Sequence, residues 1–91
     1  MGSTPRVVLY KADGCHLCEE AQGRLHELRD ELEFELDEVT IDGDAELEGR
    51  FREWLPVVEI DGERACTYYV QPEPFRRRLA AAQSRRNEAS L

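Results

Sequence analysis

Two cysteines three positions apart, Cys15 and Cys18, stand where a short apolar run gives way to a strongly periodic segment. The apolar run, residues 7–10, is typical of a short buried strand, and a polar turn of four residues follows it. Beyond the turn, apolar side chains recur at steps of three and four, which predicts a helix packed on one face. These side chains are Leu17, Ala21, Leu25, Leu28 and Leu32. The sequence thus predicts a strand at 6–10, a tight turn, and a helix that begins at Cys15 and ends near residue 31.

The start of this helix gives the two sulfur atoms different surroundings. Cys15 lies where backbone N–H groups lack partners and the helix dipole is positive, which favours the reactive thiolate. Cys18 falls just beside the apolar stripe, so we expect its sulfur to be half buried and within bonding reach of Cys15. His16 is expected to point towards water and, when protonated, to favour the thiolate further. We therefore expect Cys15 to attack disulfides and Cys18 to resolve the mixed disulfide that results.

Three other interpretations of the cysteine pair stay open from the residues alone. A structural Cys15–Cys18 staple would stabilise the fold by only about 2 kcal/mol, because the loop it closes is so small. A metal or iron–sulfur carrier would use the two thiolates as half of a tetrahedral set, with a partner supplying the rest. A redox-silent interaction domain would instead show an ordinary thiol pKa at Cys15.

Length and composition agree with one small domain in a reducing compartment. The chain has 91 residues and three cysteines, too few for a disulfide-framework secreted protein. No apolar run approaches the ~20 residues of a membrane span, and the start lacks the pattern of a signal peptide. We expect a cytoplasmic protein that binds no membrane.

Charge is spread unevenly along the chain, whose net charge is −8. Residues 31–63 carry thirteen acidic and two basic side chains, which argues against nucleic-acid binding. The basic clusters at residues 76–78 and 85–86 suggest either a docking patch for an acidic partner or, as we favour, a solvated helix face paired with the acidic half.

The acidic half predicts an edge strand and a short helix. Residues 35–41 are predicted to form a strand, but the alternation of apolar and polar side chains changes phase from Phe34 onward. Either the strand contains a bulge or Phe34 belongs to the preceding turn. Its carboxylates suit an exposed sheet edge. Asp42-Gly43-Asp44 superficially resembles a calcium loop, but the later ligand positions do not follow, and Asp44 is better explained as a helix cap. In the helix after it, Leu47, Phe51 and Trp54 are predicted to share one face.

The last third predicts a hairpin and a final helix. Asp61-Gly62 is a strong two-residue turn signal between strands at 57–60 and 64–69. Cys66 is expected to be a small buried hydrophobe rather than a regulatory thiol. Tyr68 and Tyr69 should point to opposite faces, one into the core and one outward. The final helix should start near Pro72–Pro74 and fade near Ser84, with Phe75, Leu79 and Ala82 as its apolar stripe.

The segment from Leu9-Tyr10 through Gly14-Cys15-His16-Leu17-Cys18, followed later by a proline that begins a strand, resembles the glutaredoxin branch of the thioredoxin fold. More narrowly, it is similar to small bacterial glutaredoxin-like proteins that carry Cys-His-Leu-Cys, over residues 6–82. The resemblance implies an α/β, thioredoxin-like βαβαββα fold, with a mixed four-stranded sheet covered by helices on both faces. The domain is expected at residues 6–83, between flexible ends at 1–5 and 84–91.

The resemblance also implies an activity, that of a thiol-disulfide oxidoreductase. It implies that Pro56 is cis and faces the reactive cysteine, whereas the residue pattern alone favours trans. The backbone carbonyl and amide of Leu55 would pair with an incoming substrate strand, so Gly14, Leu55 and Pro56 are the implied substrate-binding residues. The implied partners are a disulfide-containing protein or small-thiol substrate and a reductant, either glutathione or a reductase.

Two departures from glutaredoxins bear on glutathione. The Gly-Gly pair that commonly follows their last strand is replaced by Val70-Gln71-Pro72, and the lysine commonly found three residues before the first cysteine is Ala12 here. The tryptophan beside the motif of thioredoxin is also absent. We therefore expect no tightly bound cofactor and no resident metal, keep glutathione as one candidate reductant, and expect a monomer.

Overall fold

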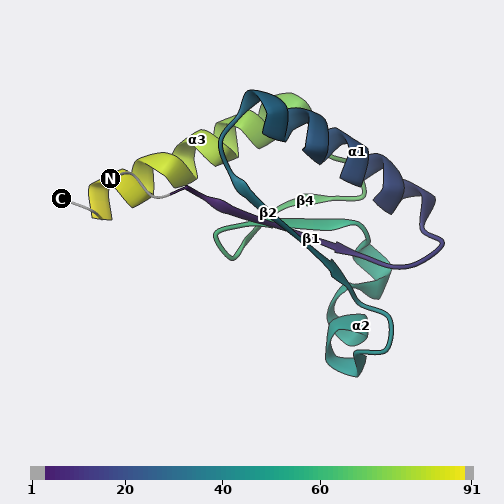
Figure 1. The fold of residues 1–91 in the computed structure, drawn as a ribbon. Helices are drawn as coiled ribbons and strands as arrows, with labels where there is room; N and C mark the ends of the chain where they lie inside the picture. The colour runs from purple at the N-terminus through teal and green to yellow at the C-terminus, as the bar shows by residue number, and fades with distance from the viewer. Residues whose placement is uncertain (1–3, 90–91) are drawn as a thin grey trace.

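Residues 4–89, the part of the chain that the computed structural model describes, form four strands and three α-helices in the order βαβαββα (Figure 1). The elements are β1 (Arg6–Lys11), α1 (His16–Glu31), β2 (Glu35–Thr40), α2 (Ala45–Phe51), the short 3-10 helix η1 (Arg52–Trp54), β3 (Val57–Ile60), β4 (Glu63–Thr67) and α3 (Pro72–Ala89). The fold is the predicted thioredoxin-like one. Among these residues, no helix is both long enough and apolar enough to cross a membrane.

The sheet has the strand order β2-β1-β3-β4, with β1 parallel to β2 and antiparallel to β3, and with β3 antiparallel to β4. Its register brings three chain segments to one end of the sheet. Tyr10, near the end of β1, pairs with Val57, the first residue of β3, and Val57 pairs with Thr67, the last residue of β4. The cysteine loop, the Pro56 turn and the segment after β4 therefore all leave the sheet at the same end.

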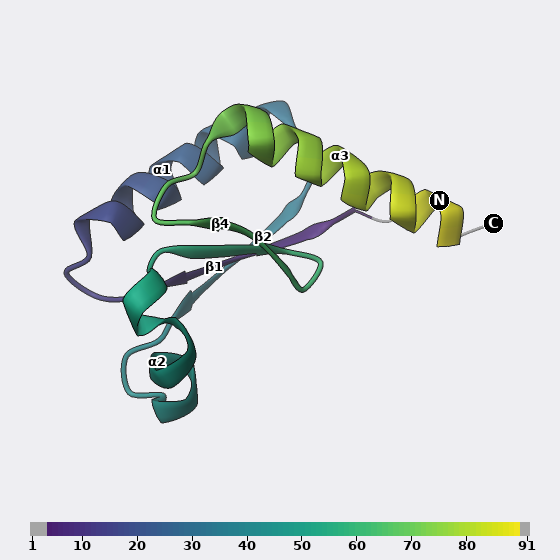
Figure 2. The same cartoon turned by 180° about the vertical axis from the view of Figure 1, so that it is seen from behind.

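Helices cover both faces of the sheet, but unequally. α1 and α3 lie together on one face, whereas α2 lies on the other side near one end, as the two opposite views show (Figures 1 and 2). The larger core forms beneath α1 and α3, where Ala21, Leu25 and Leu28 of the first predicted stripe and all of the second meet Val7 and Leu9 of β1. Leu17, also predicted for the first stripe, is only partly buried and lies outside this core. The smaller core joins Ile41, Phe51 and Val57 under α2. Trp54 lies outside it, 44% exposed, so the predicted face of the short helix is only partly buried.

The elements of the acidic half settle the alternatives that their pattern left open. β2 pairs with β1 in an uninterrupted register, so it has no bulge, and the buried Phe34 precedes the strand. β2 is an edge strand, as predicted. The Asp44 side chain accepts a hydrogen bond from the Leu47 N–H at 3.1 Å and caps α2, which confirms the helix-cap interpretation.

The prediction for the two tyrosines was wrong. β4 ends at Thr67 because Tyr68 adopts a positive φ of 67°, which breaks the alternation of an extended strand. Both rings consequently face solvent, Tyr68 at 38% and Tyr69 at 61% exposure. The hairpin before them was predicted correctly, since Asp61 and Gly62 have φ values of 50° and 84°.

Both ends of the described chain contact the sheet. Pro5 is fully buried, and its carbonyl accepts the Glu35 N–H at 2.9 Å, while the flexibility expected of the chain ends stays a prediction. α3 continues to Ala89, so its predicted end near Ser84 was wrong. Arg86 binds Asp61 of the hairpin turn and so ties the last turns of the helix to the sheet. The expectations for residues 1–3 and 90–91 lie outside the described residues.

Candidate active site

Cys15 is the N-cap residue of α1. It has extended backbone angles, and the glycine before it takes a φ of +72°, which turns the chain from the loop into the helix. The Cys15 Sγ atom accepts the backbone N–H of Cys18 at 3.2 Å, while the Cys15 carbonyl accepts that of Glu19 at 3.1 Å. A sulfur thus occupies the capping place usually filled by a side-chain oxygen, as the sequence predicted.

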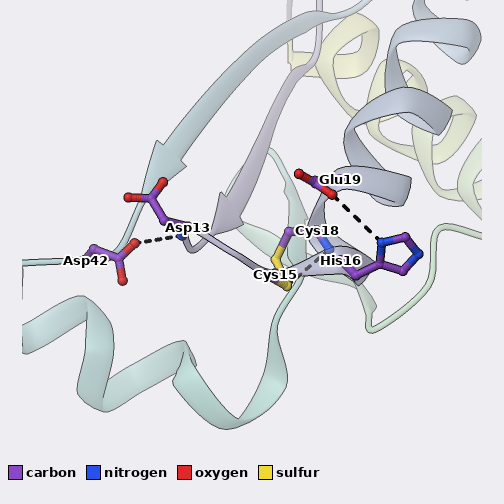
Figure 3. Close-up of a disulfide and its surroundings, with 6 residues drawn as sticks. All are labelled: Asp13, Cys15, His16, Cys18, Glu19 and Asp42. Atoms are coloured by element: carbon purple, nitrogen blue, oxygen red, sulfur yellow. Dashed lines mark hydrogen bonds and ion pairs between the residues drawn. A yellow bond between two sulfur atoms is a disulfide. The ribbon is translucent and has the colours of Figure 1, made fainter.

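Cys15 and Cys18 form a disulfide, with their Cα atoms 5.2 Å apart (Figure 3). The two residues differ in exposure, because Cys15 is partly accessible whereas Cys18 is only 2% exposed. The expectation of a half-buried Cys18 was therefore wrong. Cys18 is buried together with Ala21 and Leu25 of the apolar stripe, so the buried face of α1 is wider than the stripe alone.

His16 points away from the disulfide and towards two carboxylates, as Figure 3 shows for Glu19. Its Nδ1 lies 3.8 Å from Glu19 and its Nε2 lies 3.5 Å from Glu20. The side chain is 82% exposed, as expected from its place on the helix. Its predicted influence on the Cys15 thiolate would therefore act through space and through these two carboxylates, and it stays a prediction.

Asp42 anchors the loop that carries Cys15, a role that sequence reasoning missed. Its Oδ2 accepts the Asp13 backbone N–H at 2.7 Å (Figure 3). The neighbouring Ile41 N–H donates to the Lys11 carbonyl at 2.8 Å, so the cysteine loop is fastened to the end of β2. The signal was the position of Asp42 directly after a strand parallel to β1, which places it beside the turn that follows β1.

The Leu55–Pro56 peptide bond is cis, which confirms what the resemblance implied and the residue pattern alone did not. Pro56 is buried and immediately precedes β3 rather than being its first residue. Its carbonyl accepts the Tyr68 N–H at 2.9 Å. The register of β1 and β3 sets this turn beside the loop that leads to Cys15, so Gly14, Cys15, Leu55 and Pro56 belong to one end of the sheet.

Aromatic side chains gather at the same end, and sequence reasoning missed this cluster as well. The Trp54 and Tyr68 ring centroids lie 6.3 Å apart, and the Tyr68 hydroxyl donates to the Glu53 carbonyl at 3.0 Å. A groove of about 340 Å³ runs between the first turns of α1 and residues 68–70. Two tyrosines directly after a strand that ends at the site were the available signal.

The third cysteine, Cys66, is not part of the disulfide. Cys66 is half-buried against the larger core, and burial raises the pKa of its thiol. Within residues 4–89, no group of three or more histidine, cysteine or acidic side chains is arranged to hold a metal ion.

The mixed sheet, the cysteine pair at the start of the first helix and the cis-proline turn beside it define a thioredoxin-fold protein with a Cys-x-x-Cys disulfide. Residues 6–80 match the family model described as "Glutaredoxin-like domain (DUF836)", and the chain belongs to this family.

Solved structures resemble the chain over most of its length. A Nitrosomonas europaea protein determined by solution NMR is 28% identical, with 86% of this chain and 94% of that one covered and a TM-score of 0.75. A Staphylococcus aureus protein of unknown function is 19% identical, with 88% and 92% covered and a TM-score of 0.60. Thioredoxin from Fasciola hepatica is 20% identical, with 87% and 81% covered and a TM-score of 0.60, a likeness of fold. No curated protein sequence matches the chain.

Proposed function

We propose that this protein is a thiol-disulfide oxidoreductase in which Cys15 is the nucleophile and Cys18 the resolving thiol. One observation carries the proposal: the Cys15 sulfur caps α1, accepts the Cys18 N–H at 3.2 Å, and is bonded to the Cys18 sulfur. A backbone N–H and the positive end of a helix both favour the anionic form of a sulfur held there. The reduced Cys15 is thereby predisposed to be a thiolate, and its bonding partner is already in reach.

The reaction proceeds by two thiol–disulfide exchanges. The Cys15 thiolate attacks one sulfur of the substrate disulfide, a Cys15–substrate disulfide forms, and the other substrate sulfur leaves as a thiolate. Cys18 then gives its proton to solvent and displaces the bound sulfur, which leaves the Cys15–Cys18 disulfide. The substrate has gained two electrons and the cysteine pair has lost two. An external thiol or a reductase returns them, and glutathione is one thiol of that class.

The difference in exposure between the two cysteines supports the proposed roles. Attack on a substrate requires an accessible sulfur, and Cys15 is partly accessible while Cys18 is only 2% exposed. The backbone of Leu55, next to the cis Pro56, is proposed to pair with the extended substrate segment, with Gly14 bordering it on the other side. The placement of both turns at one end of the sheet supports this arrangement.

The experiment compares cysteine variants in the reduction of 2-hydroxyethyl disulfide, with dithiothreitol as the reductant. Cys15→Ser should abolish catalysis. Cys18→Ser, reduced and then exposed to 2-hydroxyethyl disulfide after the dithiothreitol is removed, should hold a mixed disulfide on Cys15 that mass spectrometry detects. Cys66→Ser is the matched control and should keep the wild-type rate, since Cys66 lies in β4 and outside the disulfide. Undiminished activity in Cys15→Ser would falsify the proposal.

A further inference from the structure

The groove between α1 and residues 68–70, which Glu19 and Glu20 line from the helix that Cys15 caps, narrows the class of substrate. The inference rests on the function proposed above. We propose that the site selects disulfides in cationic polypeptides, in which Lys or Arg flanks the substrate cysteine. It disfavours oxidised glutathione, which is anionic.

Carboxylates dominate the charge of the groove. Glu19, Glu20 and Glu27 line it from α1, against the single guanidinium of Arg24. The Glu19 and Glu20 side chains are 75% and 59% exposed, so they can reach an approaching ligand. They lie four and five residues after Cys15 in the helix that Cys15 caps, so a substrate segment that enters this groove from Cys15 would meet their charge.

The cations near the cysteine loop are already paired. Lys11 Nζ lies 3.0 Å from Glu38 Oε1, and the loop position that follows it is Ala12. His16 lies against Glu19 and Glu20 and can offset only part of their charge. An incoming carboxylate would therefore meet net negative charge, whereas an incoming ammonium or guanidinium group would meet attraction.

The opposite wall of the groove is aromatic and suits a polypeptide. Tyr68 and Tyr69 line it together with Val70, and Tyr69 is 61% exposed. Exposed tyrosine faces bind the guanidinium of Arg or the ammonium of Lys by cation–π attraction, and their rings also pack on the aliphatic stems of those side chains. A groove with one acidic and one aromatic wall thus fits long basic side chains.

The size of the selectivity follows from the charges. A charge pair about 8 Å apart at a partly exposed site changes an association constant by roughly three- to fivefold, and salt reduces the effect. Oxidised glutathione carries two net negative charges at neutral pH and cystamine two positive ones. We expect the catalysed rate to favour cystamine by at least about tenfold at low ionic strength.

The test measures the reduction of cystamine, 2-hydroxyethyl disulfide and oxidised glutathione by the full chain with dithiothreitol. Each rate is divided by the uncatalysed rate of the same disulfide with dithiothreitol, which removes differences in intrinsic reactivity. The expected order is cationic, neutral, anionic, and added NaCl should compress it. Equal normalised rates would overturn the substrate class and leave the oxidoreductase standing, whereas no catalysis with any disulfide would overturn both.

The double variant Glu19→Gln/Glu20→Gln assigns the effect to the groove. Removing these carboxylates can also change the thiolate fraction of Cys15, but that change affects all three disulfides alike, so the ratio of rates reports substrate charge. The ratio of cystamine to glutathione rates should fall at least about threefold. Glu33→Gln is the control, since residue 33 lies at the opposite end of the sheet beside the start of β2, and its ratio should match the wild type. An unchanged ratio in the double variant would overturn the assignment.

Discussion

The three cysteines show how surroundings decide the chemistry of one residue type. Cys15 receives a backbone N–H at the start of a helix, Cys18 is buried one turn later, and Cys66 lies half-buried in a strand against the core. A hydrogen-bond donor and a helix dipole favour a thiolate, whereas burial among apolar groups disfavours it. Reactivity should therefore differ within a single small domain.

Alkylation of the reduced protein tests this difference. Burial raises the pKa of the Cys66 thiol, so at about pH 7 nearly all of it is protonated and unreactive. Limiting iodoacetamide should modify Cys15 at least about tenfold faster than Cys66, as measured by peptide mass spectrometry over time. Raising the pH should speed the modification of Cys66 more than that of Cys15. Preferential labelling of Cys66 at neutral pH would contradict the assignment.

Replacing His16 tests its indirect influence on Cys15. The ring lies against Glu19 and Glu20, so His16→Ala leaves these carboxylates unopposed near the nucleophile. Negative charge disfavours a thiolate, so the variant should shift the pH dependence of Cys15 alkylation upward by a few tenths of a pH unit. His26→Ala, which removes an exposed histidine from a later turn of α1, is the control and should leave the profile in place. An unmoved profile in His16→Ala would rule out a tuning role.

At the scale of the elements, local signals predicted most of the framework. Apolar periodicity placed α1 and α3, and Asp61-Gly62 placed the hairpin, because each signal is contained in a few neighbouring residues. The errors arose where contacts between residues far apart in the sequence determine the local structure. β4 ends before Tyr68, whose backbone N–H donates to the Pro56 carbonyl. α3 continues beyond its apolar stripe, and in this last part Arg86 binds Asp61. The same holds for the candidate site. The spacing of Cys15 and Cys18 predicted the cysteine pair, whereas the hydrogen bond between Asp42 and Asp13 joins residues far apart in the sequence and was not predicted.

The contact between the hairpin turn and α3 makes a prediction about stability. Asp61 accepts two hydrogen bonds from the Arg86 guanidinium, at 2.5 and 2.7 Å, and one from the Arg6 backbone N–H at 3.0 Å. Asp61→Asn keeps a residue suited to the turn and removes the charge, so it should lower the free energy of unfolding by roughly 1–2 kcal/mol at neutral pH. Urea denaturation measures this change.

The pH dependence of that change has a defined sign. The Arg86 hydrogen bonds hold the pKa of the Asp61 carboxyl below its usual range. The stabilisation is therefore complete above the unfolded-state pKa of about 3.9 and is lost as the pH falls through the lower folded-state pKa. The gap between wild type and Asp61→Asn should be constant near neutrality and should narrow in acid. A gap that widens as the pH falls would contradict this role.

At the scale of the whole molecule, basic side chains gather in α3 and acidic side chains elsewhere in the fold. Three basic residues of α3 pair with acidic groups elsewhere: Arg76 with Glu31, Arg85 with Glu63 and Arg86 with Asp61. This pairing supports the solvated, partnered interpretation for these three residues. The acidic excess then remains on the β2 edge and in the groove along α1, and both the predicted monomer and the proposed substrate class rest on it.

The prediction of a monomer rests on the charged side chains at the exposed β2 edge of the sheet. Glu35 and Asp37 of β2 are 59% and 53% exposed, and Arg6 lies 3.4 and 3.2 Å from them. Two copies that joined these edges would bring like charges together, which opposes pairing. The wild type should run as one chain in light scattering at about 0.15 M NaCl, whereas Glu35→Thr/Asp37→Thr should associate more as its concentration rises. Glu35→Lys/Asp37→Lys is the control, because it inverts the charge and keeps the repulsion, and it should stay monomeric. If the threonine variant associates no more than the lysine variant does, the edge carboxylates do not prevent copies of the chain from associating.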